Sequence, residues 1–302
     1  MTLNHTLQLL GMSALWGAGF MLTRYAAPLL GPNLLAALRI AFATLALALL
    51  MRALGMRWPR RGWRTMAVGG LLGIAGPHLL FAWSALELPA GYSALLYVSS
   101  VPFGALAAWW MKQEELTPAK WAGCVLGFTG AALVVELGPL KPSLALVLAA
   151  LGATLGAAMS GSVTSLIKHA VATIEPLPLT AGLHASALAV LAPLALFDLH
   201  SARFEPSAVA AAAALGVLVS ALNWWLYARV VRHVPPMAAL STTFMSMGFG
   251  VVFAVLLLGE QIGLGHWVGG ALMVLASALV MGLKPGPWLA ALFARRARKE
   301  NT

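Results

Sequence analysis

Small polar side chains recur at helical spacing inside an apolar stretch that follows Leu88. The stripe consists of Ser93, Tyr97, Ser100 and Gly104, which are four, three and four residues apart. This spacing places them on one face of a helix. Hydroxyl and ring groups of this kind hold a small solute by hydrogen bonds and apolar contact. The stripe therefore predicts a binding surface.

The same stripe occurs a second time, displaced by 146 residues. Its second copy consists of Ala239, Thr243, Ser246 and Gly250. The displacement also aligns, without gaps, the pairs Pro89/Pro235, Phe103/Phe249, Ala108/Ala254, Glu114/Glu260, Trp121/Trp267, Gly123/Gly269 and Ala132-Leu133-Val134/Ala278-Leu279-Val280. An internal repeat of this length dictates the architecture of a chain.

A second pair of stripes lies in the first part of each half, at a displacement of 144 residues. Trp16, Phe20 and Arg24 share one helix face, and their counterparts are Ser160, Thr164 and Lys168. Between these stripes, Pro77-His78 aligns with Asn223-Trp224 at a displacement of 146. The predicted substrate-binding residues are Trp16, Phe20, His78, Tyr97, Ser100, Ser160, Thr164, Trp224, Thr243 and Ser246. The competing interpretation of each hydroxyl is a bond to a carbonyl one turn back in its own helix.

Arg39 lies well inside a second apolar stretch, where a permanent cation needs a partner. One interpretation is that it binds a carboxylate of the solute. The other is structural: Arg39 bonds helix-end carbonyls or extends to the nearby interface. No Asp or Glu lies in the middle of a span, and Asp198 is the only aspartate. Because a buried carboxylate is the usual ion-coupling group, this favours facilitated export or exchange, with His78 as the alternative proton carrier.

The composition identifies the solvent of the chain. Of 302 residues, 61% are hydrophobic and only 9% are charged, against roughly 25% charged in soluble domains. The mean hydropathy is +0.87. The net charge of +10 comes from basic residues between apolar stretches and not along one exposed face, which argues against a nucleic-acid interface. The N-terminus lacks the basic and small-residue regions of a signal peptide, so we expect a retained first membrane helix.

Ten apolar spans are each near the length of about 20 residues that a membrane helix needs. They are 6–24, 32–51, 65–86, 89–111, 118–137, 143–167, 176–197, 206–228, 234–258 and 264–283. With both termini in the cytoplasm, fifteen of the nineteen Lys and Arg residues fall on the cytoplasmic side. Arg24, Lys141 and Arg203 fall in outer connectors, and Arg39 lies within a span. This bias predicts a multi-pass inner-membrane protein with that orientation.

Five spans in each half is an odd number, so two similar halves cross the membrane in opposite directions. We therefore predict an all-α integral membrane protein of ten transmembrane helices arranged as two inverted five-helix repeats. The expected units are 1–138, 139–284 and a basic cytoplasmic tail, 285–302. Inverted repeats with a midplane site are typical of secondary transporters. Small residues four apart, Gly123/Gly127 and Gly265/Gly269, predict a close seam between spans five and ten.

The repeated motif resembles the ten-helix EamA-type members of the drug/metabolite transporter superfamily. The resemblance is carried by Leu258-Gly259-Glu260-Gln261-Ile262 with Trp267 and Gly269, by Gln113-Glu114-Glu115-Leu116-Thr117 with Trp121 and Gly123, and by Leu15-Trp16-Gly17, Pro32 and Arg39. It implies alternating access through a central cavity formed mainly by spans one, three, four, six, eight and nine. An Arg at the place of Arg39 across relatives with different substrates favours its structural interpretation.

The resemblance also implies a function. Many relatives are inner-membrane exporters of amino acids, including aromatic ones, and we expect the same here, from a chain that could act as a monomer. The alternatives are a nucleotide-sugar or sugar-phosphate carrier, which needs several cavity cations, and a drug efflux carrier. An integral-membrane lipid-modifying enzyme is less consistent, because the sequence has no metal-binding or Ser/His/Asp motif. We therefore expect no enzyme activity, no cofactor and no metal, and lipid as the surrounding partner.

Overall fold

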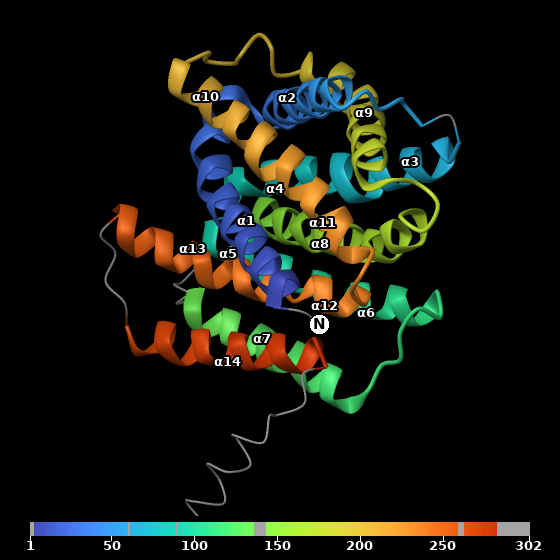
Figure 1. Cartoon of the computed structure of the whole chain (residues 1–302). Helices are drawn as coiled ribbons and strands as arrows, with labels where there is room; N and C mark the ends of the chain where they lie inside the picture. Colours follow the sequence, from blue (N-terminus) through green and yellow to red (C-terminus); the bar gives the residue numbers. More distant parts are fainter. Residues whose placement is uncertain (1–2, 60, 89, 136–142, 259–262, 283–302) are drawn as a thin grey trace, which may run out of the picture.

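The computed structural model describes residues 3–59, 61–88, 90–135, 143–258 and 263–282. Within these ranges, sixteen helical segments join end to end into ten rods, and there is no strand (Figure 1). In chain order the rods are α1 (Leu3–Leu30); α2 (Pro32–Ala53); α3 (Trp63–Gly70), η1 (Leu71–Ala75) and α4 (Gly76–Glu87); α5 (Ala90–Val98) and α6 (Ser100–Trp110); α7 (Pro118–Val135); α8 (Leu144–Ala170); α9 (Pro176–Ala195); α10 (Pro206–Ala214), η2 (Leu215–Leu222) and α11 (Asn223–Val231); α12 (Pro236–Leu240) and α13 (Thr242–Leu258); and α14 (Leu264–Val280). The predicted ten-helix, all-α class is confirmed.

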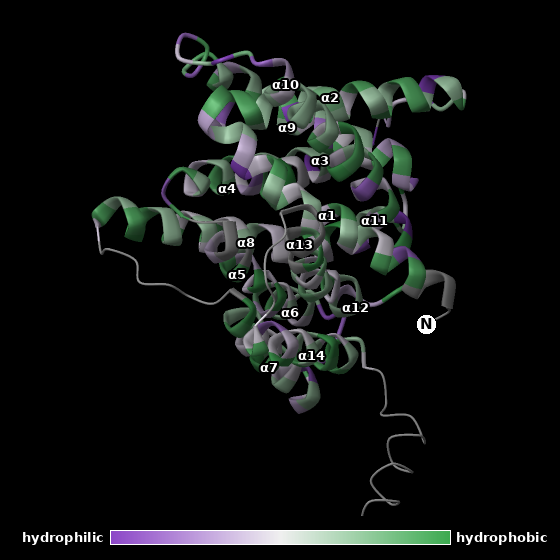
Figure 2. Ribbon diagram, turned by 90° about the vertical axis from the view of Figure 1, so that its left-hand side faces the viewer, coloured by the Kyte–Doolittle hydropathy of each residue, from purple (hydrophilic) through white to green (hydrophobic). Residues whose placement is uncertain are grey.

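The rods have membrane dimensions. Among the described residues, five helices are long and apolar enough to cross a bilayer, namely Pro32–Ala53, Trp63–Glu87, Leu144–Ala170, Pro176–Ala195 and Pro206–Val231. Leu95–Trp110 and Leu264–Val280 are shorter apolar helices. Figure 2 shows that the rods are mostly hydrophobic and that many hydrophilic residues lie in the connectors. The protein is thus a multi-pass membrane protein.

The rods pack in pairs that map onto each other when the two halves are exchanged. The first rod packs against the ninth, and the sixth packs against the fourth. The third rod packs against the sixth, and the eighth packs against the first. Two further pairings, α2 with α9 and α7 with α14, each map onto themselves, and the packing of the third rod on the seventh maps onto that of the eighth on the second. This packing pattern is that of two repeated halves related by a two-fold axis. Because each half has five rods, which is an odd number, the two halves are inverted relative to each other.

Close crossings of the helices explain part of the polar stripe. A methyl group added to Gly17 would stand 2.6 Å from the Ser246 carbonyl oxygen and 3.0 Å from the Gly250 nitrogen. The related Gly161 meets the Ser100 carbonyl and the Gly104 nitrogen in the same way. Small residues therefore recur in both stripes because two backbones touch there.

The predicted seam between spans five and ten is present between α7 and α14. A methyl group added to Gly123 would stand 3.1 Å from the Ala276 carbonyl oxygen, and one on Gly130 would stand 2.7 Å from the Gly269 carbonyl oxygen. Gly127 differs, because it packs against the ring of Phe244. Two of the glycines thus form the seam, and a third accommodates an aromatic ring from the ninth rod.

The third and eighth rods contain π-helical turns at related positions. In the third rod, η1 ends directly before Gly76 and Pro77. The related turn η2 has no proline, and its existence was not expected. A π-helical turn widens the helix and often lies at functional sites. The residues that follow these two turns are therefore candidates for the functional site.

Two expected spans are interrupted. The ladder breaks between α5 and α6 at Ser99, and between α12 and α13 at Ser241. Each serine hydroxyl donates to a carbonyl three residues earlier, Ser99 to Leu96 at 2.6 Å and Ser241 to Ala238 at 2.7 Å. Such local bonds compete with the helical ladder, so the continuous spans 89–111 and 234–258 were wrong in this detail.

The first helix is longer than expected. It continues past residue 24 to Leu30 and ends at Gly31, whose φ is +81°. Arg24 therefore lies inside α1, and its assignment to an outer connector was wrong. The helix tolerates the charge because the Arg24 guanidinium donates to the Ala85 carbonyl oxygen. Of the other basic residues, Arg60, Lys141, Lys284, Arg295, Arg296, Arg298 and Lys299 lie outside the described residues, as does Glu260.

Candidate functional site

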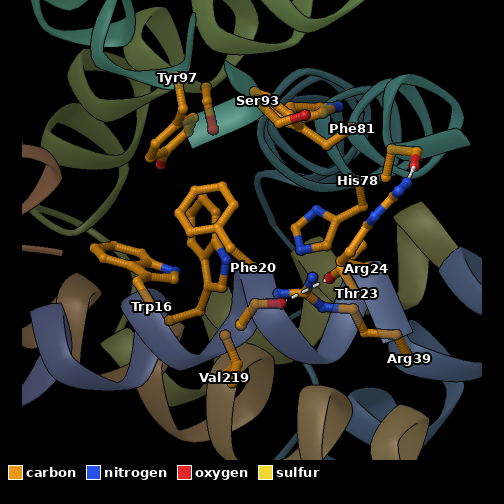
Figure 3. Close-up of a pocket in the computed structure, with 15 residues that line it drawn as sticks. Trp16, Phe20, Thr23, Arg24, Arg39, His78, Phe81, Ser93, Tyr97 and Val219 are labelled. Atoms are coloured by element: carbon orange, nitrogen blue, oxygen red, sulfur yellow. Dashed lines mark hydrogen bonds between the residues drawn. The ribbon is translucent and has the colours of Figure 1, made fainter. Parts of the chain in front are cut away.

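A cavity lies among the rods at the place where the π-helical turns end (Figure 3). It contains about 790 Å³ of space not filled by atoms, counting its open mouth. Its lining comes from six rods and consists of Trp16, Gly19, Phe20, Thr23, Arg24, Arg39, Pro77, His78, Phe81, Ala85, Ser93, Tyr97, Ser160, Val219 and Trp224. The rods implied by the family resemblance supply most of this lining, together with Arg39 from α2.

Three aromatic rings form one wall of the cavity. Tyr97 packs edge-on against Phe20 and Phe81, with ring centroids 5.8 Å and 5.4 Å away. Tyr97 lines the cavity together with Ser160 of α8. Edge-to-face packing leaves ring faces available to a guest. This wall can therefore hold an apolar or aromatic group of a solute.

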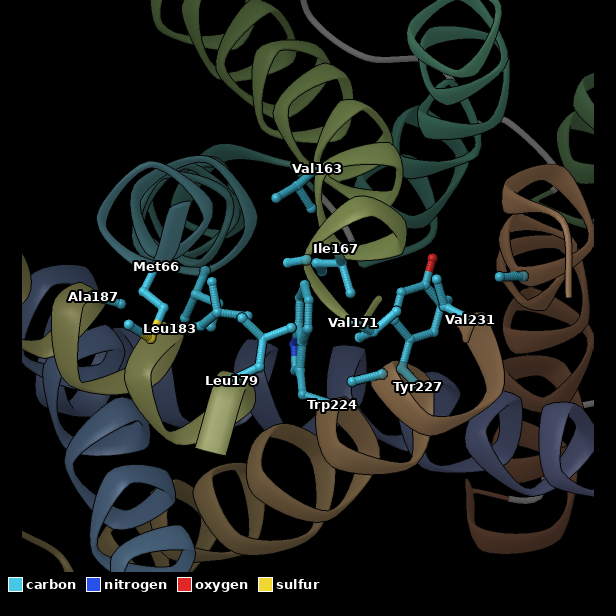
Figure 4. Packing of buried hydrophobic residues seen from close by; sticks show 14 of the residues in the cluster. Met66, Val163, Ile167, Val171, Leu179, Leu183, Ala187, Trp224, Tyr227 and Val231 are labelled. Carbon is cyan, nitrogen blue, oxygen red and sulfur yellow. The ribbon is translucent and has the colours of Figure 1, made fainter. Parts of the chain in front are cut away.

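The opposite boundary of the cavity is closed by hydrogen-bonded aromatic residues. Tyr227 packs edge-on against Trp16 and Trp224, with centroids 5.4 Å and 5.8 Å away. The Tyr227 and Thr164 hydroxyl oxygens are 2.8 Å apart. Figure 4 shows Tyr227 and Trp224 packed into the buried apolar cluster around Ile167. We call Trp16, Thr164, Trp224 and Tyr227 the floor of the cavity.

A smaller cavity adjoins the first at this floor. Its lining consists of Trp16, Tyr97, Ser160, Thr164, Trp224, Tyr227, Leu240, Thr242 and Thr243. Four of these residues, Trp16, Tyr97, Ser160 and Trp224, also line the larger cavity. The two spaces therefore share a wall, and the smaller one reaches Leu240 of α12.

Three of the side chains that line the larger cavity are basic, namely Arg24, Arg39 and His78. Arg39 donates from Nε to the Ser220 hydroxyl at 2.7 Å, and His78 Nδ1 donates to the Ile74 carbonyl oxygen at 2.6 Å. Ile74 and Ser220 occupy related positions in η1 and η2, so both π-helical turns anchor a base at the cavity. None of the lining residues named above is an Asp or Glu. The site thus offers positive charge, hydroxyls and rings.

One hydroxyl in this lining is left without a partner in the described part of the chain. Ser93 Oγ is buried with no hydrogen bond, and the residue is 5% exposed. A buried polar atom of this kind is costly unless something binds it. It points to a polar group of a guest. The described residues contain no group of three His, Cys, Asp or Glu side chains that could hold a metal ion.

Most of the residues predicted from the sequence meet at these two cavities. Trp16, Phe20, Arg39, His78, Tyr97, Ser160 and Trp224 line the larger one. Thr164 and Thr243 line the smaller one.

Ser100 and Ser246 line neither of the two cavities. They are buried at the helix crossings of Gly161 and Gly17. The Ser246 hydroxyl donates to the Thr242 carbonyl at 2.6 Å, and Ser100 Oγ lies 3.4 Å from Thr243 Oγ1.

Among the lining residues that the sequence analysis did not single out are Phe81, Thr23 and Tyr227. A signal for two of them existed, because Phe81 and Tyr227 are related by the displacement of 146 and follow His78 and Trp224 by one helical turn. Nothing in the sequence distinguished Thr23 from other threonines in apolar spans.

Two other polar residues have structural contacts. His184 donates from Nδ1 to the Thr180 carbonyl at 2.9 Å, and its ring lies edge-on to Trp224, a residue of the floor. Glu114 accepts the Met237 backbone N–H at 3.0 Å, which caps the start of α12, and pairs with Lys120 at 2.7 Å. Both residues position helices around the site.

Comparison with known proteins agrees with this geometry. The EamA-like transporter family matches twice, over residues 5–136 and 147–282. A "Probable terminal-alkyne amino-acid exporter" from Streptantibioticus cattleyicolor is 27% identical over 270 residues, which is 88% of this chain and 89% of that protein. A solved crystal structure covers 98% of this chain and 99% of its own, with a TM-score of 0.74 and 19% identity, and so shares the fold. Because the family pattern spans most of the chain in two consecutive copies, this protein belongs to the EamA-like transporter family and is a membrane transporter, not an enzyme.

Proposed function

We propose that this transporter exports amino acids with apolar or aromatic side chains through the central cavity. The observation that carries the proposal is the position of Arg39, which borders a space lined mainly by rings and hydroxyls, with Arg24 and His78 as its other basic residues. Its Nε is engaged by Ser220, and a guanidinium has further N–H groups that bind a carboxylate. No carboxylate of the lining competes for them.

The aromatic wall supports the choice of side chain. An α-carboxylate held at Arg39 would leave the side chain of the solute beside Phe20, Phe81 and Tyr97, where apolar burial stabilises binding. The unpartnered Ser93 hydroxyl can accept a bond from the α-amino group. The related exporter from Streptantibioticus cattleyicolor is named for an amino acid with a terminal alkyne, which is an apolar group. Its name supports the amino-acid class.

The orientation belongs to this proposal as well. With both termini in the cytoplasm, the described Arg52, Arg57, Arg61 and Arg64 between the second and third rods lie inside, as do Arg229 and Arg232 after the eighth. Basic residues accumulate on the cytoplasmic side of membrane proteins. In this orientation, export moves the solute from the floor side of the cavity to the Arg24 side. The protein acts in the inner membrane and contains both halves in one chain.

A second candidate, a carrier of sugar phosphates or nucleotide sugars, is favoured by one observation: Arg24 also borders the cavity. The Arg24 guanidinium is bound to the Ala85 carbonyl. We therefore take Arg39 as the cation that binds the ligand.

The test is counterflow. Purified protein in liposomes loaded with unlabelled phenylalanine should accumulate labelled phenylalanine transiently, and loading with uridine diphosphate glucose should not support this. Accumulation of a labelled nucleotide sugar instead would select the second candidate. Absence of movement of any amino acid, by protein that is folded and monodisperse, would refute the proposed solute class.

A further inference from the structure

Two cations occupy related positions near the ends of two rods. Arg24 lies near the end of α1 and Lys168 near the end of α8, and the two are 144 residues apart. The Arg24 guanidinium donates to the Ala85 carbonyl, and Lys168 Nζ donates to the Val231 carbonyl at 2.8 Å. Ala85 and Val231 are themselves related by the displacement of 146. The same contact has therefore been kept at both ends of the molecule, although its cation differs.

Each contact joins the two rods that border the cavity on that side. Ala85 lies in the last turn of α4, and Val231 is the last residue of α11. Carbonyls at a helix C-terminus lack partners within the helix and carry the negative end of its dipole. A cation from a neighbouring rod therefore stabilises the closed approach of the two rod ends, and it must leave these carbonyls when the ends separate.

The Lys168 end is fastened at several points. Lys168 Nζ also donates to the carbonyls of Arg232 at 3.2 Å and Val234 at 3.0 Å, so it binds the connector between α11 and α12. On the same side, Gln113 Nε2 donates to the Ser165 carbonyl at 2.9 Å, and Glu114 caps α12. Three rods and the connector between the fourth and fifth rods meet in this network. The floor, with its bond between Thr164 and Tyr227, lies one helical turn above Lys168 along α8.

The Arg24 end is different. Arg24 and Ala85 border the larger cavity, whereas Lys168 and Val231 line neither of the two cavities described. Thr23 and Phe20, which lie on the same helix as Arg24, also line this cavity (Figure 3). The space for solute therefore reaches the Arg24 contact, while the floor separates it from the Lys168 contact.

We propose that Arg24 with Ala85 and Lys168 with Val231 are the two gate contacts of the transport cycle, broken alternately as the cavity opens to one side and then to the other. In this structure both gate contacts are formed, and the Lys168 gate is the cytoplasmic one in the proposed orientation. The residues act on rod position, not on the solute. The inference rests on transport through this cavity but not on the identity of the solute.

The test measures access to the cavity from each side. Ser160, which lines both cavities, is replaced by cysteine in a Cys124→Ala background, and a membrane-impermeant maleimide is applied to right-side-out and inside-out vesicles without any solute. Lys168→Ala should raise the labelling rate from the Lys168 side by about tenfold, because charge-assisted hydrogen bonds favour the closed state. Lys168→Arg should retain most of the protection. Arg24→Ala should lower the labelling rate from the Lys168 side, since it releases the other gate.

A matched control is Arg229→Ala, because Arg229 is on the same rod end as Val231 but lies over the Trp225 ring at 5.4 Å. It should leave both labelling rates unchanged. If Lys168→Ala does not fold, Lys168→Met keeps the aliphatic stem and removes only the donor. An unchanged rate in a folded Lys168 variant, or an equal rise from both sides, would overturn the proposal, since equal rises indicate general loosening. Failure of phenylalanine counterflow would leave this result unaffected.

Discussion

Thr164 and Tyr227 join hydroxyl to hydroxyl at 2.8 Å across the floor of the cavity, and their counterparts in the other half are Phe20 and Phe81. Phe20 and Phe81 both pack against Tyr97 on the wall where a solute fits. The two halves have thus diverged at matched positions. One pair closes the floor through hydroxyl groups, and the other pair supplies an apolar wall.

Loss of the floor bond should destabilise the protein. Tyr227→Phe keeps the ring contacts with Trp16 and Trp224 and removes the hydroxyl, which should cost about 1 kcal/mol. Thermal unfolding in detergent should show a lower Tm. Tyr25→Phe is the matched control, because the Tyr25 hydroxyl bonds Ser207 on an exposed surface at 2.8 Å. Equal Tm values for Tyr227→Phe and the wild type would show that the floor bond contributes nothing.

The aromatic wall should determine affinity for aromatic solutes. Tyr97→Ala removes a ring that contacts both Phe20 and Phe81, and we expect the half-saturating concentration of phenylalanine to rise about tenfold. Tyr97→Phe keeps the ring and should change it little. Counterflow rates at a series of phenylalanine concentrations measure both variants. A larger loss for Tyr97→Phe than for Tyr97→Ala would mean that the hydroxyl, and not the ring, binds the solute.

The helix crossing at Gly161 should tolerate no side chain. Gly161→Ala places a methyl group against the Ser100 carbonyl and the Gly104 nitrogen, and such overpacking costs about 1–3 kcal/mol. We expect a Tm several degrees lower and a lower yield of folded protein. Gly248→Ala is the control, since a methyl group there meets no atom within 4 Å. A Tm for Gly161→Ala equal to that of Gly248→Ala would contradict the crossing.

Asp198 should contribute to stability through a helix terminus. Its carboxylate accepts the backbone N–H groups of Asn33 at 2.6 Å and Leu34 at 3.1 Å, which caps α2. Asp198→Ala should cost about 1–2 kcal/mol without changing the order of preference among solutes. In contrast, Glu205→Ala breaks only the exposed pair with Arg203 and should change the Tm little. A changed solute preference in Asp198→Ala would indicate a role beyond the cap.

The ten rods followed from the sequence because each is an apolar run of membrane length, and several begin at a proline after an extended residue, as α9, α10 and α12 do. The details that were missed depend on tertiary partners. Helix α1 continues through Arg24 because Ala85 accepts its charge. The turn η2 has no proline to mark it, although its counterpart η1 is followed by Pro77.

The site was predictable to the extent that helical periodicity assigns faces. Trp16, Phe20, His78 and Tyr97 were correctly grouped on faces that meet at one cavity. Periodicity does not distinguish a face that lines a cavity from a face that crosses another helix. Ser100 has the same size and polarity as Ser160, yet its carbonyl packs against Gly161. The predicted contact of Ser100 and Ser246 with substrate stays a prediction.

Competition by paired solutes tests the central claim, which is that Arg39 holds a solute carboxylate beside an aromatic wall. Phenylalanine and phenylalaninamide are compared as competitors of labelled phenylalanine counterflow, in the wild type and in Arg39→Gln. The wild type should prefer phenylalanine by about tenfold or more, as a charge-assisted bidentate contact implies, and Arg39→Gln should lose most of this preference. Equal competition by both solutes in the wild type, or an undiminished preference in folded Arg39→Gln, would contradict the account.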